Sequence, residues 1–304
     1  MNILGIIDQM LILFFLMAVG YAAAKLKVMD SVSDEKLTKI VINIALPALT
    51  ISSVSDVPPG MGAGELGYIF LYSFIVFAIL ALISIALPLT LRAKKTDLGT
   101  YQFMTMFGNV AFMGYPVISA IFGTEAIFYC AALNIVFGLL VFSVGITMIA
   151  GGGKKFNPKL LINTPLISSL IAVILFLLKV ELPTLLISCL DKLGGVTTPA
   201  AMLLLGSVIS RLPIKELFTE WRIYPFTLVK LIVSPILVWL ILRNFIANDM
   251  VLGALVVLSG MPVATNATML CIEYGGNQEL VSKGIFLTTV LSMATIPIMA
   301  YLFF

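Results

Sequence analysis

Two short glycine–proline motifs lie inside long apolar stretches of this sequence. They are Gly114-Tyr115-Pro116 and Gly260-Met261-Pro262, with Asn109 shortly before the first and Thr265 and Asn266 shortly after the second. A helix that is interrupted inside a membrane frees backbone N–H and C=O groups, which lipid cannot satisfy. In membrane carriers such interruptions arrange helix ends and free carbonyls around a bound solute. The two motifs therefore predict a binding site for a polar solute at mid-membrane.

The expected helix ends favour an anion as that solute. If each motif divides a helix, the second half begins near Pro116 or Pro262, because proline fits a first helical turn. Both N-terminal ends would then direct partial positive charge toward the site, which suits a carboxylate. The Asn109 amide can donate to the same carboxylate. The free carbonyls of the first halves, at 108–113 and 259–260, could instead hold a small cation.

The polar side chains near the motifs have two interpretations. Amides and hydroxyls often form contacts between membrane helices and need not bind a solute. We favour the binding role for Asn109, because it adjoins the expected interruption. For Asn266 both interpretations stay open, and for Thr265 the interhelical contact is favoured. Asn134 is a further intramembrane amide and a candidate for the same cavity.

Asn43 and Lys230 are secondary candidates for contact with the solute or with an ion. Asn43 precedes Pro47 by four residues, so its amide is expected mainly to bond carbonyls that the proline leaves free. Lys230 lies eight residues into an apolar segment. Its side chain either extends to the inner interface, which is the favoured interpretation, or places an ammonium group that attracts the anion or replaces a bound sodium.

The composition is that of an integral membrane protein with helical spans. Of its 304 residues, 61% are hydrophobic and only 11% charged, against about 25% charged in a soluble domain. Spans of about 20 apolar residues are needed to cross a bilayer. Ten segments qualify: 3–24, 36–55, 66–91, 98–121, 125–149, 160–179, 186–210, 223–243, 250–273 and 279–303.

Several function classes are disfavoured by what the sequence lacks. It has no histidine, and its three cysteines lie in separate apolar segments without metal-ligand spacing. We therefore expect no resident metal, no cofactor, no enzymatic activity and no nucleic-acid partner. No aspartate or glutamate is expected deep in a span, so a cation–proton exchanger is unfavoured. Na⁺ or H⁺ as a coupling ion stays open, with Asn109, Gly260 and Asn266 as the candidate Na⁺ contacts.

The positions of lysine and arginine predict the orientation of the chain. Fourteen of these residues fall in the connections expected on one side, at 25–39, 92–95, 154–159, 211–222 and Lys283, and only three on the other. Positive residues favour the cytoplasmic side. We therefore expect both termini outside the cytoplasm of a cell inner or plasma membrane.

The two halves of the sequence show signs of a repeat. Lys27-Val28 recurs as Lys179-Val180 and Pro47-Ala48 as Pro199-Ala200, each 152 positions later, while the two glycine–proline motifs are 146 positions apart. Five helices in each half is an odd number, so the second half would enter the membrane inverted. The expected domains are residues 1–150, a cytoplasmic linker at 151–159, and residues 160–304.

Four stretches carry a resemblance to a known family. They are Asn-Val-Ala-Phe-Met-Gly-Tyr-Pro at 109–116, Gly-Met-Pro-Val-Ala-Thr-Asn-Ala at 260–267, Ile-Ala-Leu-Pro-Ala-Leu at 44–49 and Lys-Leu-Ile-Val-Ser-Pro at 230–235. The whole chain resembles the auxin efflux carrier family and its PIN-like and malonate-transporter-like bacterial relatives. The short connection between the fifth and sixth segments is more similar to the bacterial members than to the plant ones.

The resemblance implies a fold and a function. The fold would have ten helices in two inverted repeats, with broken helices 4 and 9 that cross, as in bile-acid symporters. Helices 1, 2, 6 and 7 would form a scaffold, and helices 3–5 and 8–10 a mobile transport domain. The function would be secondary active or facilitative transport of small organic anions such as malonate, malate or auxin-like acids, by alternating access.

The site implied by the resemblance lies at the crossover, with Asn109 in the position of the family's substrate-binding asparagine and Asn134 in that of its polar helix 5 residue. The expected partners are the small organic anion, the lipid bilayer and a second copy of the chain. The alternatives are a sodium-coupled organic anion symporter of the bile-acid type and, less favoured, a transporter-like membrane sensor.

Overall fold

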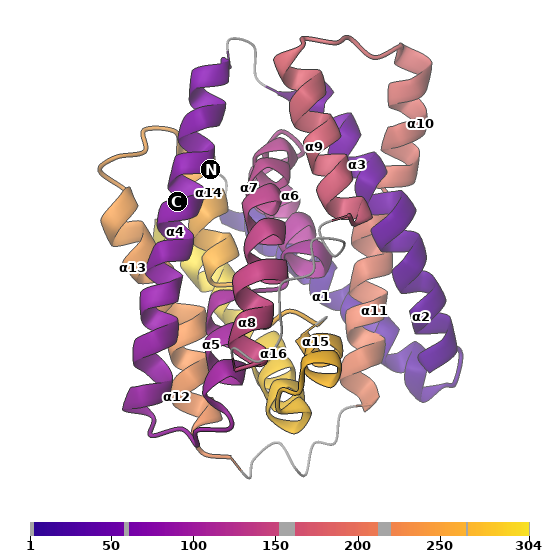
Figure 1. Cartoon of the computed structure of the whole chain (residues 1–304). Coiled ribbons are helices and arrows are strands. Elements are labelled where there is room, and N and C mark those ends of the chain that lie inside the picture. Colours follow the sequence, from indigo (N-terminus) through magenta and orange to yellow (C-terminus); the bar gives the residue numbers. More distant parts are fainter. Residues whose placement is uncertain (1–2, 58–60, 152–161, 212–219, 266, 304) are drawn as a thin grey trace. The chain divides into compact units, whose positions relative to one another are not determined.

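The computed structural model describes residues 3–57, 61–151, 162–211, 220–265 and 267–303 (Figure 1). Within these ranges the chain is helical and contains no strand, apart from one isolated antiparallel bridge between Gly108 and Val263. Six helices are long and apolar enough to cross a membrane, and four shorter apolar helices accompany them. Each of the ten segments expected from the sequence overlaps one of these helices. The ranges are Ser31–Asp56, Ala63–Thr90, Ala126–Ile149, Thr184–Arg211, Ile223–Leu242 and Gln278–Phe303, and then Leu11–Lys25, Val110–Phe122, Thr164–Leu177 and Asp249–Ser259.

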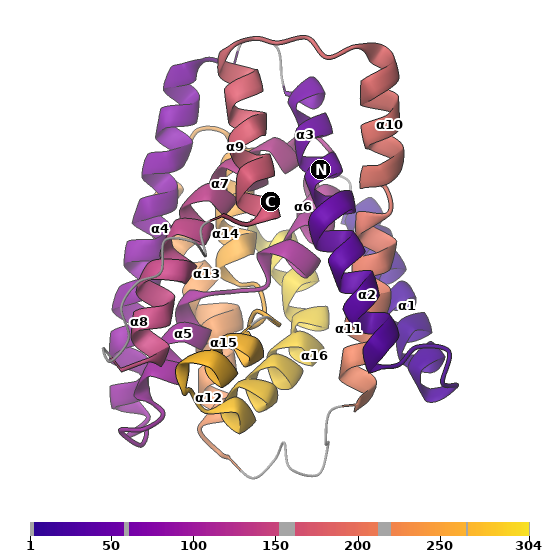
Figure 2. The same ribbon diagram turned by 45° about the vertical axis from the view of Figure 1, so that its right-hand side comes forward.

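The chain divides into two compact units, and the first consists of Met1–Phe70, Ala111–Ile135 and Ile162–Leu212. In this unit α1 lies along α11, and α3 contacts both α9 and α10 (Figures 1 and 2). Val41, Ala200 and Leu204 form a buried apolar cluster between the second and seventh expected segments. The helices of this unit are α1 (Ile3–Lys25), α2 (Ser31–Ile40), η1 (Val41–Ala45), α3 (Leu46–Ser52), η2 (Ser53–Asp56), α6 (Tyr115–Phe122), α9 (Thr164–Leu177), α10 (Thr184–Gly194) and α11 (Thr197–Arg211).

The second unit consists of Leu71–Val110, Val136–Leu161 and Pro213–Phe304. An aromatic cluster of Phe77, Phe103, Phe107 and Phe137 stabilises it, with ring centroids 4.9–6.3 Å apart. Two helices, α4 (Ala63–Thr90) and α7 (Ala126–Leu140), and the π-helix η3 (Val110–Gly114) cross from one unit to the other. The remaining helices are α5 (Leu98–Met106), η4 (Val141–Gly145), α8 (Ile146–Ile149), α12 (Ile223–Leu228), η7 (Val229–Val233), α13 (Ser234–Leu242), α14 (Asp249–Ser259), α15 (Ala267–Tyr274) and α16 (Gln278–Phe303).

Several helix boundaries in the two halves recur at a spacing of 152 positions. The last residues of α1 and α9, Lys25 and Leu177, are this far apart, and so are the last residues of α4 and α13. The first residues of α6 and α15 and the first residues of α7 and α16 repeat at the same spacing. The glycines after α6 and α15, Gly123 and Gly275, both have positive φ, at 86° and 85°. These equivalent positions support an internal repeat in a single register.

The lysines of the repeated Lys-Val pair end their helices in the same way. Lys27 and Lys179 have φ values of 60° and 51°, in the left-handed region. The next residue donates its N–H back to the helix in each case, from Val28 to Ala23 O and from Val180 to Leu175 O. This is the Schellman pattern, which more often has glycine at the left-handed position. The repeat thus extends from residue identity to backbone conformation.

Candidate functional site

The first interruption of the fourth expected segment lies earlier than the sequence motif suggested. α5 ends at Met106, residues Phe107 to Asn109 are extended, and helix resumes at Val110 as η3. The chain then continues helically through Gly114-Tyr115-Pro116 into α6, so the prediction of an interruption at this motif is wrong. Pro116 is the second residue of α6 and follows directly on the π-helix η3, so the hydrogen-bond register changes just before the proline and the helix does not break.

The second interruption lies where the sequence predicted it. α14 ends at Ser259, Gly260 is its C-cap, and the chain is extended through Met261 and Pro262. α15 begins only at Ala267, however, so Pro262 does not start the second half-helix. Thr265 therefore lies in the turn before α15 and not in its first helical turn as expected. Asn266 lies outside the described residues.

The two interruptions cross each other inside the second unit. Gly108 and Val263 form an antiparallel bridge, and the Asn109 N–H donates to the Pro262 carbonyl at 2.7 Å. Gly108 allows this approach, because a Cβ there would lie 2.9 Å from Met261 Cβ and 3.1 Å from Met261 O. The N–H of Val263 donates to the Thr288 hydroxyl of α16 at 3.0 Å. The crossing thus satisfies backbone groups that the broken helices would otherwise leave without a bond.

Asn109 lies directly beside the crossing. Its residue is 3% exposed and follows Gly108 of the bridge, at the point where η3 begins. Gly108 and Gly260 are 152 positions apart, so the two interruptions follow the register of the helix boundaries. The two glycine–proline motifs, 146 positions apart, do not follow it. The interrupted elements place one amide side chain, from Asn109, next to two extended backbone segments.

Lys230 does not extend to an interface. It belongs to the π-helix η7 and is fully buried at 0% exposure. Its ammonium Nζ donates to Thr105 O at 2.9 Å and to Ser259 O at 3.4 Å. These carbonyls belong to the last turns of α5 and α14, the two helices that end at the crossing. The interpretation favoured from the sequence, an extension to the inner interface, is therefore wrong.

The remaining candidates lie in the first unit. Tyr115 and Pro116 are buried in the first turn of α6. The Asn134 amide donates to Ser169 Oγ at 3.2 Å and to Pro165 O at 3.4 Å, so it links α7 to α9. This is the interhelical role that was the alternative for such amides. Its role in binding stays a prediction.

Asn43 also forms contacts between helices. Its amide donates to Lys39 O at 3.0 Å, one turn earlier in the same helix, and its side-chain oxygen accepts a bond from Thr164 Oγ1 at 2.7 Å. Both bonds lie in the first unit. Neither bond reaches a carbonyl that Pro47 leaves free, so that expectation stays a prediction.

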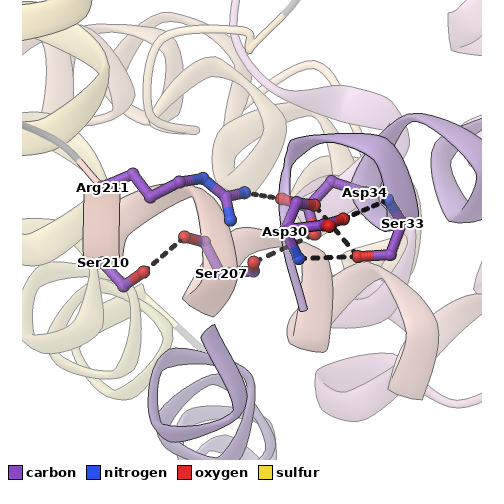
Figure 3. A network of polar contacts seen from close by, with 6 residues as sticks. All are labelled: Asp30, Ser33, Asp34, Ser207, Ser210 and Arg211. Carbon is purple, nitrogen blue, oxygen red and sulfur yellow. Dashed lines mark hydrogen bonds and ion pairs between the residues drawn. The ribbon is translucent and has the colours of Figure 1, made fainter. Parts of the chain in front are cut away.

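A polar network in the first unit was missed by the sequence analysis (Figure 3). Asp34 is 6% exposed, accepts a bond from Ser207 Oγ at 3.0 Å and forms an ion pair with Arg211. The network fastens the start of α2 to the end of α11. Asp30, beside Asp34, caps α2. Its carboxylate accepts a hydrogen bond from the Ser33 N–H, which lowers the pKa of Asp30 below its usual value. Asp34 was not identified from the sequence, because it lies among the polar residues that connect the first two expected segments.

A metal centre is not formed by the part of the chain that the structure describes, since no group of three histidine, cysteine, aspartate or glutamate side chains gathers there. The chemistry available at the crossing is that of amide donors, backbone N–H and C=O groups, and one buried ammonium group. Such groups bind and release charged solutes without forming covalent bonds to them.

Comparisons with known proteins agree with a transport role. Residues 5–300 match the family described as "Membrane transport protein". The chain is 25% identical to a protein of Methanocaldococcus jannaschii named "Uncharacterized transporter", with 97% of this chain and 98% of the relative covered. It is 29% identical to an "Uncharacterized transporter" of Methanothermobacter thermautotrophicus, with 98% of both chains covered. It is 28% identical to a Rhizobium meliloti protein named "Putative malonate transporter", with 95% of this chain and 93% of the relative covered.

These matches extend over nearly the whole chain, and they point to a transporter and not to an enzyme. Together with the apolar helices they identify a multi-pass membrane protein. The chain belongs to the membrane transport protein family, the family of the auxin efflux carriers that its motifs resemble.

Proposed function

We propose that this protein is a secondary active or facilitative carrier of small organic anions, with carboxylates such as malonate or malate as its substrates. The observation that carries the proposal is the crossing of two interrupted helices beside the buried amide of Asn109. Interrupted helices that meet in this way are a feature of carriers that bind their solute at mid-membrane. The name of the Rhizobium meliloti relative adds support for a dicarboxylate.

The binding group would be the buried Asn109 amide, beside the extended segments of the crossing. The first N–H groups of the helices that follow the interruptions, at Val110 and Ala267, donate to Gly108 O and Ala264 O, both at 3.0 Å. These helix starts would therefore act on the anion through their partial positive charge and not through a bond from those two groups. Thr265 lies in the turn before Ala267 and would add a hydroxyl. Asn266 stays a candidate beside it, and Asn134 and Gly114 to Pro116, which belong to the first unit, stay candidates from the sequence alone.

The architecture we propose is that of ten helices in two inverted five-helix repeats. The recurring 152-residue spacing of helix boundaries supports the repeat. The division into units supports part of the scaffold and transport assignment, because α1–α3 and α9–α11 belong to the first unit and α12–α16 to the second. Expected helices 3, 4 and 5 are divided between the units, so their assignment to a mobile domain rests on the family resemblance.

The transport cycle would be alternating access, in a cell inner or plasma membrane, with both termini outside the cytoplasm and a homodimer as the assembly. The side with more lysine and arginine supports this orientation. A sodium-coupled organic anion symporter is the second candidate. It is the alternative that the family resemblance leaves open, and uptake that depends on Na⁺ would identify it. Against it, the carbonyls of Thr105 and Ser259 at the ends of the interrupted helices bond Lys230.

The test is uptake of radiolabelled malonate into liposomes that contain the purified protein. Asn109→Ala removes one hydrogen bond to a charged group, worth about 1.5–3 kcal/mol, so uptake at low substrate concentration should fall by roughly 10- to 100-fold. Asn244→Ala is the matched control, because this amide is exposed and lies in a connection of the same unit. Equal uptake by the two variants would exclude Asn109 from the site. Imposed Na⁺, proton and voltage gradients would then identify the coupling.

A further inference from the structure

The Lys230 ammonium group occupies the place where the two interrupted helices end. Thr105 O and Ser259 O, which it contacts, would normally accept bonds from the N–H groups four residues later. Those are the N–H groups of Asn109 and Val263, and both donate elsewhere: Asn109 to Pro262 O, and Val263 to Thr288 Oγ1. The crossing thus frees these two carbonyls, and Lys230 binds both.

The surroundings of Lys230 are those of a cation site. The last turns of α5 and α14 contribute the partial negative charge of helix C-termini. Among the described residues, no carboxylate forms an ion pair with Lys230. The charge of a side chain that is 0% exposed is therefore balanced by backbone carbonyls. Carriers that couple to Na⁺ use the same groups, unwound carbonyls and half-helix C-terminal ends, to hold the ion.

The backbone around Lys230 holds its side chain in this position. The π-helix η7, which contains Lys230, ends immediately before Ser234 and Pro235, where α13 begins. A Cβ at Gly260, the cap of α14, would lie 3.0 Å from Pro235 Cγ, so η7 and α13 lie tightly against the end of α14. Ser234 Oγ donates to Val229 O at 2.9 Å, across the turn that contains Lys230. Lys230 is therefore fixed against α14 by packing on its own helix.

We propose that Lys230 is the resident cation of the crossing, and that this carrier neither binds nor requires Na⁺ there. Only one part of this inference rests on the proposed transport function, namely that uptake does not need Na⁺. The occupation of the cation position can be tested on the purified protein without any substrate. Failure of malonate uptake would therefore leave this inference standing, and failure of this inference would leave the carrier function standing.

The experiment measures the thermal unfolding midpoint of the detergent-purified protein in NaCl, ethylammonium chloride and choline chloride at equal ionic strength. The wild type should give the same midpoint in all three salts. Lys230→Ala removes the ammonium group, so its midpoint should rise with concentration and saturate in NaCl or ethylammonium chloride relative to choline chloride. A site filled at ten times its Kd should raise the midpoint by roughly 3 °C. Lys283→Met, which removes a buried ammonium group that is paired with Glu279, should show no such response.

Two outcomes would overturn the inference. A saturable, Na⁺-specific rise in the wild-type midpoint would mean that the crossing holds a cation besides Lys230. A Lys230→Ala protein that responds to neither cation would mean that the lysine only tethers the helices. If Lys230→Ala does not fold, Lys230→Gln replaces it, since glutamine keeps a hydrogen-bond donor without the charge. The wild-type measurement decides the first outcome without any variant.

Discussion

Gly108 is the position at which the crossing is most sensitive to a single added atom. Gly108→Ala would place a Cβ 2.9 Å from Met261 Cβ and 3.1 Å from Met261 O. Neither atom can rotate away, because one is the base of a side chain and the other belongs to the backbone. The two extended segments must therefore separate by several tenths of an ångström, which would strain the 2.7 Å bond from Asn109 N to Pro262 O.

The expected cost follows from what such overpacking does elsewhere. An added methyl group in a closely packed interior costs about 1–3 kcal/mol. At about 2–4 °C per kcal/mol for a chain of this order of size, the unfolding midpoint should fall by roughly 2–12 °C. Malonate uptake should fall as well in the protein that remains folded, because Asn109 moves with its backbone.

Two other glycines make the comparison specific. Gly284→Ala places its Cβ 2.7 Å from Met104 Sδ, near the far end of a flexible side chain that can move, so its cost should be smaller. Gly67→Ala meets no atom within 4 Å and lies inside α4, where alanine should stabilise the helix by about 0.5–1 kcal/mol. The reasoning would be refuted if Gly108→Ala kept a midpoint equal to that of Gly284→Ala or higher.

Two further changes test the helix ends and the polar network of the first unit. Lys179→Gly and Lys27→Gly should each raise the free energy of unfolding by about 1 kcal/mol, because glycine relieves the left-handed conformation, whereas Lys192→Gly in the last turn of α10 should lower it by about 1 kcal/mol. A lower midpoint for both left-handed positions would contradict this. Asp34→Asn should lower the free energy of unfolding by about 1–3 kcal/mol. It should couple to Arg211→Gln in a double-mutant cycle, and effects that add within about 0.5 kcal/mol would show that the ion pair has no energetic role.

The sequence was sufficient for the class, the helical segments and the second interruption. The apolar spans are long, and their polar connections are distinct, so the segment boundaries were predicted within a few residues. Gly260-Met261-Pro262 was identified correctly because a glycine cap followed by proline is a strong local signal for the end of a helix. The Lys-Val and Pro-Ala pairs revealed the 152-residue register that the helix boundaries follow.

The first interruption could not be placed, because its cause is not local. Gly108 has no proline beside it, and the chain is extended there because Val263 forms the bridge from the other half of the sequence. Pro116 gave the stronger local signal and was misleading, because a π-helix precedes it and the helix continues through the proline without a break. A comparison of glycines 152 positions apart would have selected Gly108 as the partner of Gly260.

Lys230 was assigned incorrectly for a similar reason. Its acceptors, Thr105 O and Ser259 O, are backbone atoms of two distant helices, and backbone carbonyls are present at every position of a sequence. Nothing in the residues around Lys230 distinguishes a lysine that reaches an interface from one that binds helix ends. The distinction depends on the crossing, which a single segment does not reveal.

The recurring spacing of helix boundaries means that the two halves have the same number of residues over a long stretch. From Lys27 and Lys179 to Ala126 and Gln278, neither half has a net gain or loss of residues relative to the other. Connections between helices usually tolerate insertions, yet over this stretch the two halves have kept the same total length. Within this stretch, positions 152 residues apart are therefore expected to be counterparts. A substitution and its counterpart 152 residues away can be compared directly. The difference between their effects on stability or uptake measures how far the two repeats have diverged in role.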